Sequence, residues 1–405
     1  MSYTSDYLQS ESAAQNFEVS VLVNCMVQDA TRLSASDLHI EPWEKSIAVR
    51  ARVNGVLVEV AHLPLELLDK ISMRFKVMAS LVTYQAGLPQ DGTAVGGPEL
   101  EGVQLRVSIF PTTRGEKIVA RLFDPRDRRF DLDSLNFDST ALKGLLRLLK
   151  RSSGLLLFTG PTGSGKTSTM YSALCHIMQR DGTTVSVSTV EDPVEFNLPM
   201  ISQTQINPAQ EFTYATALRS IMRQDPQVIM VGEIRDPETA AIAVQAGLTG
   251  HLVLSTIHSG TSTGAFTRLI NMDIEPFMLA SSVLGVLGLR LVRRNCQNCT
   301  EAYTPEPSQL RVIPEELVAQ AQFQHGIGCE QCSSTGFAGR LPVTELLVVD
   351  EPFREAVLKK MPTSALAEIA IQQGMRTLWQ NGLSHAISGD TSLEETVRVL
   401  AADML

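Results

Sequence analysis

The sequence predicts an α/β protein in which a parallel sheet with crossover helices follows a smaller α+β domain. Three observations predict this class. Short apolar segments that resemble strands alternate with helical segments between residues 154 and 256. A glycine-rich loop joins the first of these strands to the next helix, which is the setting of a phosphate-binding loop. Earlier in the chain, alternating strands flank an Asn-Gly turn, which is typical of an antiparallel hairpin.

The smaller domain is assigned to residues 1–125. Its clearest signal is Asn54-Gly55, a favoured two-residue turn between two alternating segments. In the segment 103–110 apolar and polar residues alternate, so one face of this strand is expected to be buried and the other to carry Arg106. Helices are expected at 17–33 and 64–79, and strands at 47–53, 56–60, 103–110 and 116–123.

The predicted linker is residues 126–140, in a charged segment that begins with Asp124-Pro125. The larger domain is assigned to residues 141–292, with buried strands at 154–159, 184–189, 227–231 and 251–256. From about residue 293 this alternation is expected to stop at a cysteine-bearing, loop-rich module that extends to residue 345. Residues 346–405 predict a helical region, with helices at 363–373, 376–388 and 393–402.

The composition, with 44% hydrophobic and 19% charged residues, allows substantial cores. A formal net charge of −10 argues against binding to nucleic acid mainly through charge, because such proteins present basic surfaces. The N-terminus has no basic region followed by an apolar run, so no secretory signal is expected. The longest apolar stretch, residues 277–292, is too short and too polar to span a bilayer. We expect a cytosolic protein that is peripheral to a membrane through a partner, without direct insertion.

The run from Gly160 to Thr167 matches the pattern G-x-x-x-x-G-K-[ST] at every fixed position. It follows an apolar strand and opens a helix, so the helix dipole adds to anion binding. Lys166 is expected to reach the β- and γ-phosphates of a nucleoside triphosphate, and Thr167 to ligate Mg²⁺. An ordinary glycine-rich turn is the alternative. The predicted nucleotide-binding residues are Gly160, Pro161, Thr162, Gly163, Ser164, Gly165, Lys166, Thr167 and Ser168.

Hydrolysis also needs a carboxylate that orients or deprotonates water. Glu233 follows the apolar strand at 228–231, and ligands of doubly wound sheets bind at the carboxyl ends of strands, so Glu233 is the first candidate. Glu191 lies in a second acidic cluster after the preceding strand. It could hold Mg²⁺ through water or position the attacking water, although a plain acidic turn explains it equally well.

Two histidines flank the strand at 251–256, and Arg219 and Arg223 lie one turn apart on the predicted helix 214–224. His258 comes just after the strand, where a γ-phosphate is expected, and is a candidate sensor of that phosphate. His251 begins the strand and is expected to be structural. The two arginines are candidate cations for the charge that develops during hydrolysis, although arginines are also common on surfaces.

Four of the six cysteines form two C-x-x-C pairs, Cys296 with Cys299 and Cys329 with Cys332. This spacing is typical of metal chelation in a reducing compartment, and four thiolates suit a closed, structural Zn²⁺ site. Four unrelated reduced cysteines or a redox pair are the alternatives. The other two, Cys25 and Cys175, lie on apolar helical faces and are expected in the cores.

Four segments resemble, in their order along the chain, the secretion ATPases of type II secretion and type IV pilus assembly. They are the phosphate loop, the acidic box 189–195, the segment 232–236 and the box 249–258. The N-terminal half resembles the same family at 35–42, 89–92 and 111–117. The resemblance covers roughly residues 19–400.

This resemblance implies a homohexamer in which a flexible linker joins a PAS-like N-terminal domain to a RecA-like motor domain. In the family, arginines of the N-terminal domain complete the ATP site, and Arg106 and Arg121 match their positions. Family hexamers convert ATP hydrolysis into domain rotation, which assembles pilins or pseudopilins through an inner-membrane platform protein. The cysteine module resembles that of assembly and secretion members more than that of retraction motors.

The chain departs from the family in two ways. Thr93 stands where the family usually has arginine after Pro-Gln-Asp-Gly, so a contact from that position is expected to be lost. The chain also begins almost at the nucleotide-site domain, so the domain that many relatives use to dock on a membrane-anchored partner is not expected here.

The leading prediction is Mg²⁺-dependent ATP hydrolysis by a hexameric cytoplasmic motor that powers type II secretion pseudopilus or type IV pilus assembly. One alternative is an ATP-regulated interaction protein without useful turnover, which would need no water-activating carboxylate such as Glu233. The other is a nucleic-acid motor, against which the acidic balance and the lack of a basic, aromatic-interleaved stretch argue.

Overall fold

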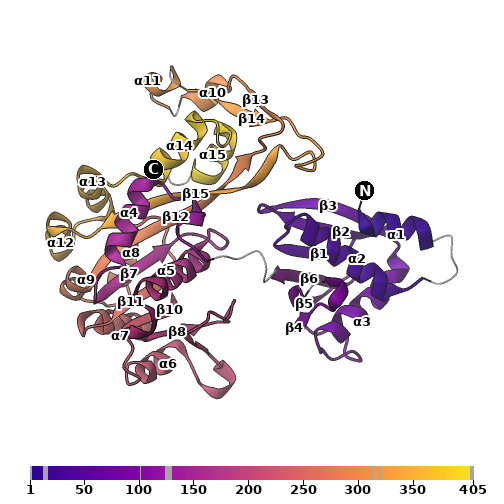
Figure 1. Ribbon diagram of the computed structural model, residues 1–405, viewed down its shortest axis with the longest axis horizontal. Coiled ribbons are helices and arrows are strands. Elements are labelled where there is room, and N and C mark those ends of the chain that lie inside the picture. Colours follow the sequence, from indigo (N-terminus) through magenta and orange to yellow (C-terminus); the bar gives the residue numbers. More distant parts are fainter. Residues whose placement is uncertain are drawn as a thin grey trace. The chain divides into compact units, whose positions relative to one another are not determined.

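The protein is represented by a computed structural model that describes residues 2–11, 17–100, 102–123, 130–311, 313–319 and 321–401. The chain divides into two compact units, Met1–Arg129 and Phe130–Leu405 (Figure 1). Of the predicted linker, residues 126–129 lie outside the described residues. The rest of it begins the second unit, with a short 3-10 helix at Asp133–Leu135 and then α4 (Ser139–Leu148).

Unit 1 is an antiparallel six-stranded sheet with helices packed on one face, which confirms the expected α+β domain. The strand order is β3-β2-β1-β6-β5-β4. At the β2–β3 turn, Asn54 and Gly55 both have positive φ, of 49° and 85°, as this type of tight hairpin turn requires. The strands are β1 (Asp37–Pro42), β2 (Ile47–Val53), β3 (Val56–Leu63), β4 (Gln90–Val95), β5 (Gln104–Thr112) and β6 (Gly115–Phe123), and the helices are α1 (Tyr3–Glu11), α2 (Val19–Arg32) and α3 (Leu68–Met78).

The apolar side chains of the unit 1 strands pack on α2 and α3, among them Leu38, Val107 and Ile109. The opposite face of the sheet carries charged residues, because side chains alternate between the faces of a strand. Along one row of this open face the paired residues are Thr93, Arg106, Arg121, Asp37 and Arg52 in succession.

Unit 2 contains a seven-stranded sheet in the order β15-β12-β7-β11-β10-β8-β9. All neighbouring pairs are parallel except β15 with β12. The strands are β7 (Gly154–Thr159), β8 (Val187–Glu191), β9 (Ser202–Gln205), β10 (Val228–Ile234), β11 (Leu252–Ile257), β12 (Val283–Asn295) and β15 (Phe337–Val348). The α/β class predicted from the sequence is therefore confirmed.

Helices cover both faces of this sheet. Leu155 and Leu157 of β7 face one core and Leu156 and Phe158 face the other, so the strand reads as a continuous apolar run. One face packs on α4 and α5 (Lys166–Asp181), and the other on α6 (Tyr214–Ile221), α7 (Pro237–Leu248), α8 (Gly264–Ile270), α9 (Pro276–Ser282), α12 (Glu351–Leu358) and α13 (Thr363–Gln372).

The sequence did not predict the two sheet strands β12 and β15, which lie before and after the cysteine module. The apolar stretch before it is the end of α9 followed by β12, and β15 returns from the cysteine module to pair with β12 along its length. The glycines that interrupt the stretch are packing positions: a Cβ on Gly285 would lie 2.6 Å from the carbonyl oxygen of Leu347. The strand expected at 184–189 is also shifted, since Gly182–Thr184 is a 3-10 turn and β8 begins at Val187.

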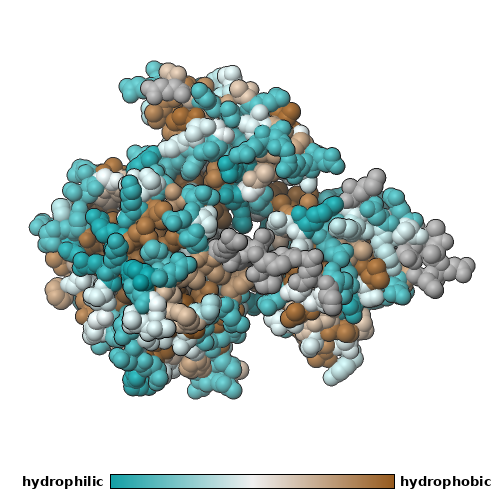
Figure 2. Space-filling model, viewed as in Figure 1, coloured by the Kyte–Doolittle hydropathy of each residue, from teal (hydrophilic) through white to brown (hydrophobic). Residues whose placement is uncertain are grey.

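The chain ends in α14 (Leu378–Ile387) and α15 (Leu393–Leu400), close to the predicted helices. The cysteine module carries a two-stranded ribbon of β13 (Thr300–Ala302) and β14 (Gln324–Gly326), together with α10 (Pro307–Leu310) and α11 (Glu315–Val318). Hydrophobic residues on the face seen in Figure 2 form patches between hydrophilic ones. Within the described residues, no helix combines the length and the apolar character that crossing a membrane requires.

Candidate nucleotide and metal sites

The phosphate loop lies between β7 and α5, as the sequence predicts. Its glycines adopt conformations that other residues rarely adopt: φ is +145° at Gly160, +78° at Gly163 and +93° at Gly165, the residue before α5. A Cβ on Gly160 would lie 2.4 Å from the carbonyl oxygen of Leu289, so only glycine fits there. Lys166 Nζ donates to the carbonyl oxygens of Gly160 and Pro161, at 2.7 and 2.9 Å, which holds the ammonium group against the loop.

The residues present fit a polyphosphate. The hydroxyl of Ser164, a residue that is 4% exposed, has no hydrogen-bond partner among the described residues, although buried polar atoms are normally paired. The α5 N-terminus adds unpaired backbone N–H groups and a positive dipole end. Burial lowers the pKa of Lys166, while Glu233 raises it and Arg290 lowers it, so both of these side chains lie within electrostatic reach of the lysine.

Glu233 is held between the side chains of His258 and Arg235. One carboxylate oxygen lies 2.6 Å from His258 Nε2, and the other accepts a hydrogen bond of 2.6 Å from Arg235 Nε. The carboxylate side chain is 12% exposed and that of His258 is 56% exposed, so the pair lies at the surface of the sheet edge. The structure thus brings together Glu233 and His258, which the sequence proposed separately.

The strand order explains why Glu233 and His258 lie close together. β7, β11, β10 and β8 are consecutive parallel neighbours, so their carboxyl ends meet at one edge of the sheet. The phosphate loop follows β7, His258 follows β11, Glu233 lies near the end of β10 and Glu191 ends β8. Ligands of such sheets bind at this edge.

Glu191 is enclosed in a hydrogen-bond network. It is 3% exposed, and one of its carboxylate oxygens accepts hydrogen bonds from Thr189 Oγ1 at 2.5 Å and from Gln203 Nε2 at 3.0 Å. The hydroxyl of Tyr171 donates to the other oxygen, and burial together with this contact raises the pKa of that tyrosine. These contacts occupy both oxygens of the carboxylate that the sequence offered as a second candidate for positioning the attacking water.

Arg219 and Arg223 make local contacts. Arg219 lies on α6 and pairs with the exposed Glu238 of α7 at 2.5 Å. The helix ends at Ile221, three residues earlier than predicted, and Arg223 Nη1 donates to the Arg219 carbonyl oxygen at 3.1 Å. Among the described contacts, neither arginine meets the phosphate loop or Glu233.

Arg106 and Arg121 lie directly opposite each other on β5 and β6, on the open face of unit 1. Arg121 Nε donates to Asp37 at 3.0 Å, whereas Arg106 is exposed and has no hydrogen bond or ion pair to any described residue. Like charges at directly opposite positions of a sheet are destabilising, so this pair favours an anion at that face. Thr93 lies opposite Arg106 on the other side, where the family arginine would extend the same cationic row.

Sequence reasoning missed two cations near the phosphate loop. Arg235 lies two residues after Glu233 in the box that carries the resemblance, but was not named as a site residue. Arg290 lies on β12 and is 8% exposed, with Nη2 donating to Gly260 at 2.8 Å and Nη1 to Leu289 at 3.1 Å. A charged residue inside an apolar stretch is the signal that could have found it, because arginine is seldom buried without a role.

The four predicted cysteines converge, with all four Sγ atoms within 4.8 Å of one another. Cys296 and Cys329 are 3.8 Å apart, as are Cys299 and Cys332, and Cys329 and Cys332 are 3.7 Å apart. Sulfurs bound tetrahedrally at about 2.3 Å from one Zn²⁺ would be about 3.8 Å apart, so the donor set fits this ion. Burial raises the pKa of Cys332, but backbone N–H groups of Cys329 and Gly336, with the thiols of Cys329 and Cys299, outweigh this effect and lower the pKa. Burial and the contacts with the other thiols raise the pKa of Cys299, so the two shifts belong to one cluster that shares its protons.

The two other cysteines, Cys25 and Cys175, are only half-buried rather than fully in the cores, and burial raises the pKa of each. His251 Nδ1 lies 3.1 Å from the Ala246 carbonyl oxygen, a contact that ties the end of α7 to the start of β11.

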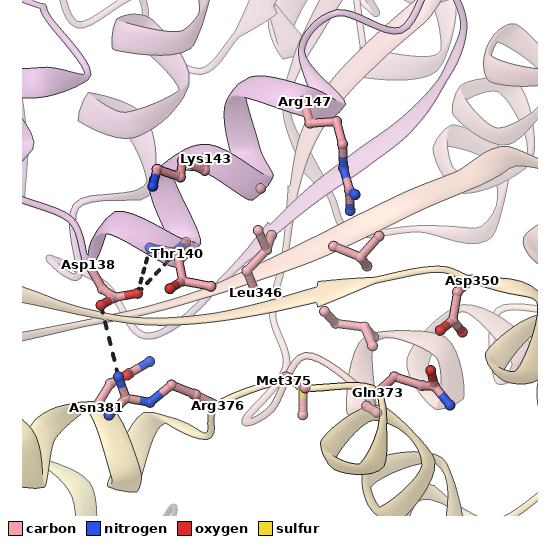
Figure 3. A pocket seen from close by; sticks show the side chains of 16 residues that line it. Asp138, Thr140, Lys143, Arg147, Leu346, Asp350, Gln373, Met375, Arg376 and Asn381 are labelled. Atoms are coloured by element: carbon pink, nitrogen blue, oxygen red, sulfur yellow. Dashed lines mark hydrogen bonds and ion pairs between the residues drawn. The ribbon is translucent and has the colours of Figure 1, made fainter.

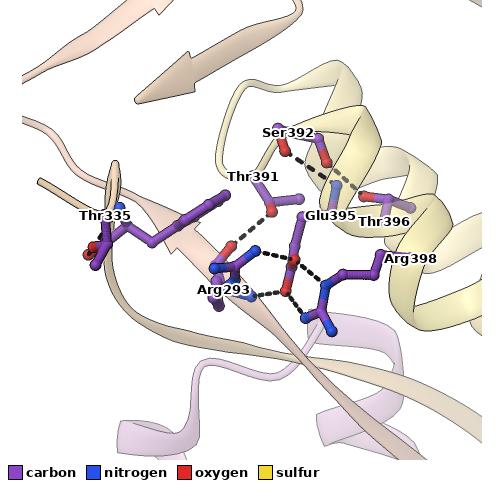
Figure 4. A network of polar contacts seen from close by, with 8 residues as sticks. Arg293, Thr335, Thr391, Ser392, Glu395, Thr396 and Arg398 are labelled. Carbon is purple, nitrogen blue, oxygen red and sulfur yellow. Dashed lines mark hydrogen bonds and ion pairs between the residues drawn. The ribbon is translucent and has the colours of Figure 1, made fainter. Parts of the chain in front are cut away.

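A buried ionic network joins the base of the cysteine module to the last helix (Figure 4). Glu395 of α15, whose side chain is fully buried, lies between Arg293 of β12 and Arg398, at 2.8 and 2.6 Å. The Arg293 guanidinium also lies over the Phe337 ring, 4.0 Å from its centre, and Thr391 Oγ1 donates to the Arg293 carbonyl oxygen at 2.6 Å. The strand that enters the cysteine module is therefore anchored to α15.

A pocket of about 570 Å³ lies away from the phosphate loop, between α4, β15 and the start of α14 (Figure 3). Lys143 and Arg147 project from α4 on one side, and Met375 and Arg376 lie on the other. Of its two acidic lining residues, Asp138 and Asp350, Asp138 caps α4 by accepting from the Thr140 and Ala141 N–H groups and pairs with Arg376 at 3.9 Å.

Comparisons with known proteins identify the family of the chain. The family described as "Type II/IV secretion system protein" matches residues 12–398. The chain is 43% identical over 397 residues to the type II secretion system ATPase E of Vibrio cholerae, covering 97% of this chain and 77% of that protein. It is 42% identical to the type IV pilus assembly ATPase PilB of Thermus thermophilus, covering 96% of this chain and 43% of that protein.

Solved structures resemble the chain in fold. The Legionella pneumophila ATPase DotB has a TM-score of 0.71 at 20% identity, with 96% of this chain and 97% of that chain covered. The pilus retraction motor PilT with bound ADP has a TM-score of 0.62 at 23% identity, with 93% and 96% covered.

Proposed function

The chain belongs to the type II/IV secretion system protein family and is a P-loop ATPase, and we propose that it acts as a Mg²⁺-dependent homohexamer at the cytoplasmic face of the inner membrane. Its ATP hydrolysis would power assembly of a type II secretion pseudopilus or a type IV pilus. The observation that carries this proposal is that Glu233, His258 and the phosphate loop share one edge of the sheet.

The chain's own residues account for the steps of hydrolysis. The phosphate loop and Lys166 bind and orient the triphosphate, and Thr167 would hold a Mg²⁺ ion, which would supply neutralising charge to the phosphates. Glu233 accepts a proton from the attacking water, and Arg235 and His258 keep its carboxylate aimed at this task. Glu191, whose oxygens are already occupied, positions the end of β8 rather than activating water.

The cations have separate tasks in this proposal. His258 senses the γ-phosphate through its contact with Glu233, and Arg106 and Arg121 stabilise the developing charge from unit 1. Arg219 and Arg223 contribute only if α6 changes its contacts when nucleotide binds. We also propose that the four cysteines hold one structural Zn²⁺.

The partners we propose are an inner-membrane platform protein and membrane-anchored assembly proteins. This follows from the relatives, which are named as secretion and pilus assembly ATPases at more than 40% identity. No nucleic-acid partner is expected, given the net charge of −10.

The test is ATP turnover per chain over a wide range of protein concentration, with Glu233→Gln as the background. In this variant we expect kcat to fall by about two orders of magnitude or more while nucleotide still binds, because an amide cannot take the proton. Wild-type specific activity should rise with concentration as sites are completed between chains. The matched control is the exposed Glu275→Gln, which should keep full activity. Turnover in Glu233→Gln equal to wild type would contradict the assignment of the base.

A further inference from the structure

The segment from His258 to Thr263 connects the candidate γ-phosphate sensor to parts of the protein far from the nucleotide. At one end His258 contacts Glu233 at 2.6 Å. The next residue, Ser259, exchanges two hydrogen bonds with Thr159 Oγ1, at 2.8 and 3.1 Å, and Thr159 immediately precedes the phosphate loop. These contacts tie the segment to the residue before the phosphate loop and to Glu233.

At its other end the same segment is held by Glu345 of β15. The Ser262 N–H donates to Glu345 Oε1 at 2.9 Å, and Ser262 Oγ donates to the Glu345 carbonyl oxygen at 3.2 Å. Both residues are buried: Ser262 is 0% exposed and Glu345 is 5% exposed. A Cβ on Gly288, the β12 residue paired with Glu345, would lie 3.0 Å from Ser262 Oγ, so the contact is closely packed.

The second carboxylate oxygen of Glu345 reaches the C-terminal helices. Glu345 Oε2 accepts the N–H of Leu378, the first residue of α14, at 3.3 Å. The neighbouring contact from Asn381 Nδ2 to the Thr344 carbonyl oxygen, at 2.5 Å, fastens the same turn of α14 to β15. No cation pairs with Glu345 among the described residues, so its carboxylate is held by backbone N–H groups from two segments that lie 116 residues apart.

We propose that Glu345 is a positioning residue that sets the placement of His258 and couples the nucleotide state to the first turn of α14. The inference rests on the proposed ATPase function, which it deepens. A buried carboxylate that accepts one N–H from each of two segments links their positions, because releasing either donor leaves a buried polar group unpaired. When His258 and Ser259 shift with the γ-phosphate, Ser262 shifts with them, and Glu345 passes the change to Leu378.

The start of α14, which would receive the change, borders a pocket. The pocket described above lies beside the start of α14, and Met375, Arg376 and Asn381 line it (Figure 3). Beyond α14, α15 carries Glu395, which pairs with Arg293 at the base of the cysteine module. Leu378 belongs to the same buried hydrophobic cluster as Leu400 of α15, so contacts lead from Leu378 through α15 to the base of that module.

The decisive variant is Glu345→Gln. A glutamine has one acceptor oxygen and an NH₂ group that donates, so one of the two backbone N–H groups loses its acceptor. We expect kcat to fall about ten- to a hundredfold, because a small displacement of a catalytic element has an effect of this size. The KM for ATP should stay nearly unchanged, since the phosphate loop is intact. The matched control is Glu355→Gln on α12, whose side chain is 61% exposed and which removes the same charge.

A second measurement separates coupling from a merely structural role. Amide hydrogen exchange at residues 377–381 is compared with and without a non-hydrolysable ATP analogue, in wild type and in Glu345→Gln. The wild type and Glu355→Gln should show a nucleotide-dependent change there, and Glu345→Gln should lose it while its melting temperature stays near wild type.

The proposal is overturned if the exchange difference persists in Glu345→Gln, or if the variant matches the control in kcat. If the variant does not fold, the exchange measurement on the wild type decides. The absence of a nucleotide-dependent change at Leu378 would then refute the coupling. Failure of the proposed function would appear separately, as wild-type protein that binds the analogue but does not hydrolyse ATP, and the exchange measurement would still test Glu345.

Discussion

His39 is unusual among the residues of unit 1, because it is 8% exposed and neither ring nitrogen has a hydrogen-bond partner among the described residues. It lies on the open face of the sheet, paired across β1 with Arg50 and Val119. Burial, followed by the charge of Arg52, lowers its pKa, although Asp37 and Glu41 act in the opposite direction. Lys117 lowers it further. The folded state therefore favours the neutral imidazole.

This predicts a specific acid sensitivity. Because the pKa of His39 is lower in the folded than in the unfolded chain, the unfolded chain binds more protons, and unit 1 loses stability as the pH falls below about 6.5. The carboxylate of Glu41, whose pKa Lys117 and Arg50 hold down against the effect of burial, contributes only at more acidic pH. Urea unfolding between about pH 5 and 7, followed by the fluorescence of Trp43, should show a shallower dependence in His39→Gln than in wild type. Equal slopes would contradict this assignment.

Among individual residues, the sequence identified the site residues that belong to a motif of fixed spacing and missed those that do not. The phosphate loop, Glu233 and the cysteine pairs have fixed spacings, and each lies where the pattern predicts. Arg290 and Glu345 are single charged residues inside buried strands, and their partners lie on segments distant in the sequence. Only the fold reveals such contacts, because no local spacing encodes them.

Among the strands of the unit 2 sheet, the sequence did not predict β9, β12 and β15. The alternation of strands with helices predicted the bounds of β7, and those of β10 and β11 to within three residues at each end. β12 follows α8 and α9 and is parallel to β7, but glycines and Arg290 interrupt its apolar run. β15 lacks the alternation, because it returns antiparallel from the cysteine module instead of through a helix.

The network at α15 makes a prediction about stability. Glu395→Gln removes a fully buried carboxylate and leaves Arg293 and Arg398 without their shared partner. We expect unit 2 to lose roughly 2–4 kcal/mol, less than for a fully enclosed pair because Arg398 is half exposed. Urea unfolding followed through Trp379 measures this loss. Glu394→Gln, the exposed neighbour, is the matched control and should change little.

The cysteine cluster predicts metal-dependent stability. Protein with its thiols reduced should contain about one Zn²⁺ per chain, and chelation should lower the melting temperature of unit 2 without changing that of unit 1. Cys299→Ser should have the same effect without chelator. Metal-free protein with unchanged melting would exclude a structural site.

For the whole molecule, the charged residues are divided between two units that the chain connects through residues outside the described structure. The nucleotide loop and Glu233 belong to unit 2, whereas Arg106 and Arg121 belong to unit 1. If one chain's unit 1 serves another chain's unit 2, catalysis is a property of the assembly and not of the chain.

This predicts complementation. Arg106→Gln and Glu233→Gln should each lack turnover, and mixing the two proteins should restore part of it, because some mixed sites combine an intact arginine with an intact glutamate. The mixture of Arg106→Gln with Arg121→Gln is the control and should stay inactive. Activity that never reappears on mixing would mean that each site is completed within one chain.

The course of β12 gives the motor domain a mechanical element. The strand passes the phosphate loop at Leu289 and ends at Asn295, directly before Cys296, so about 20 Å of extended backbone lies between nucleotide and sulfur cluster. From Leu289 to Asn295 the strand pairs with β15, whereas its pairing with β7 ends at Gly288. An extended strand held along its length transmits push and pull along its axis with little stretch. The cysteine cluster would then fix the far end of β12. Disrupting the cluster should make β12 less rigid where it contacts the phosphate loop.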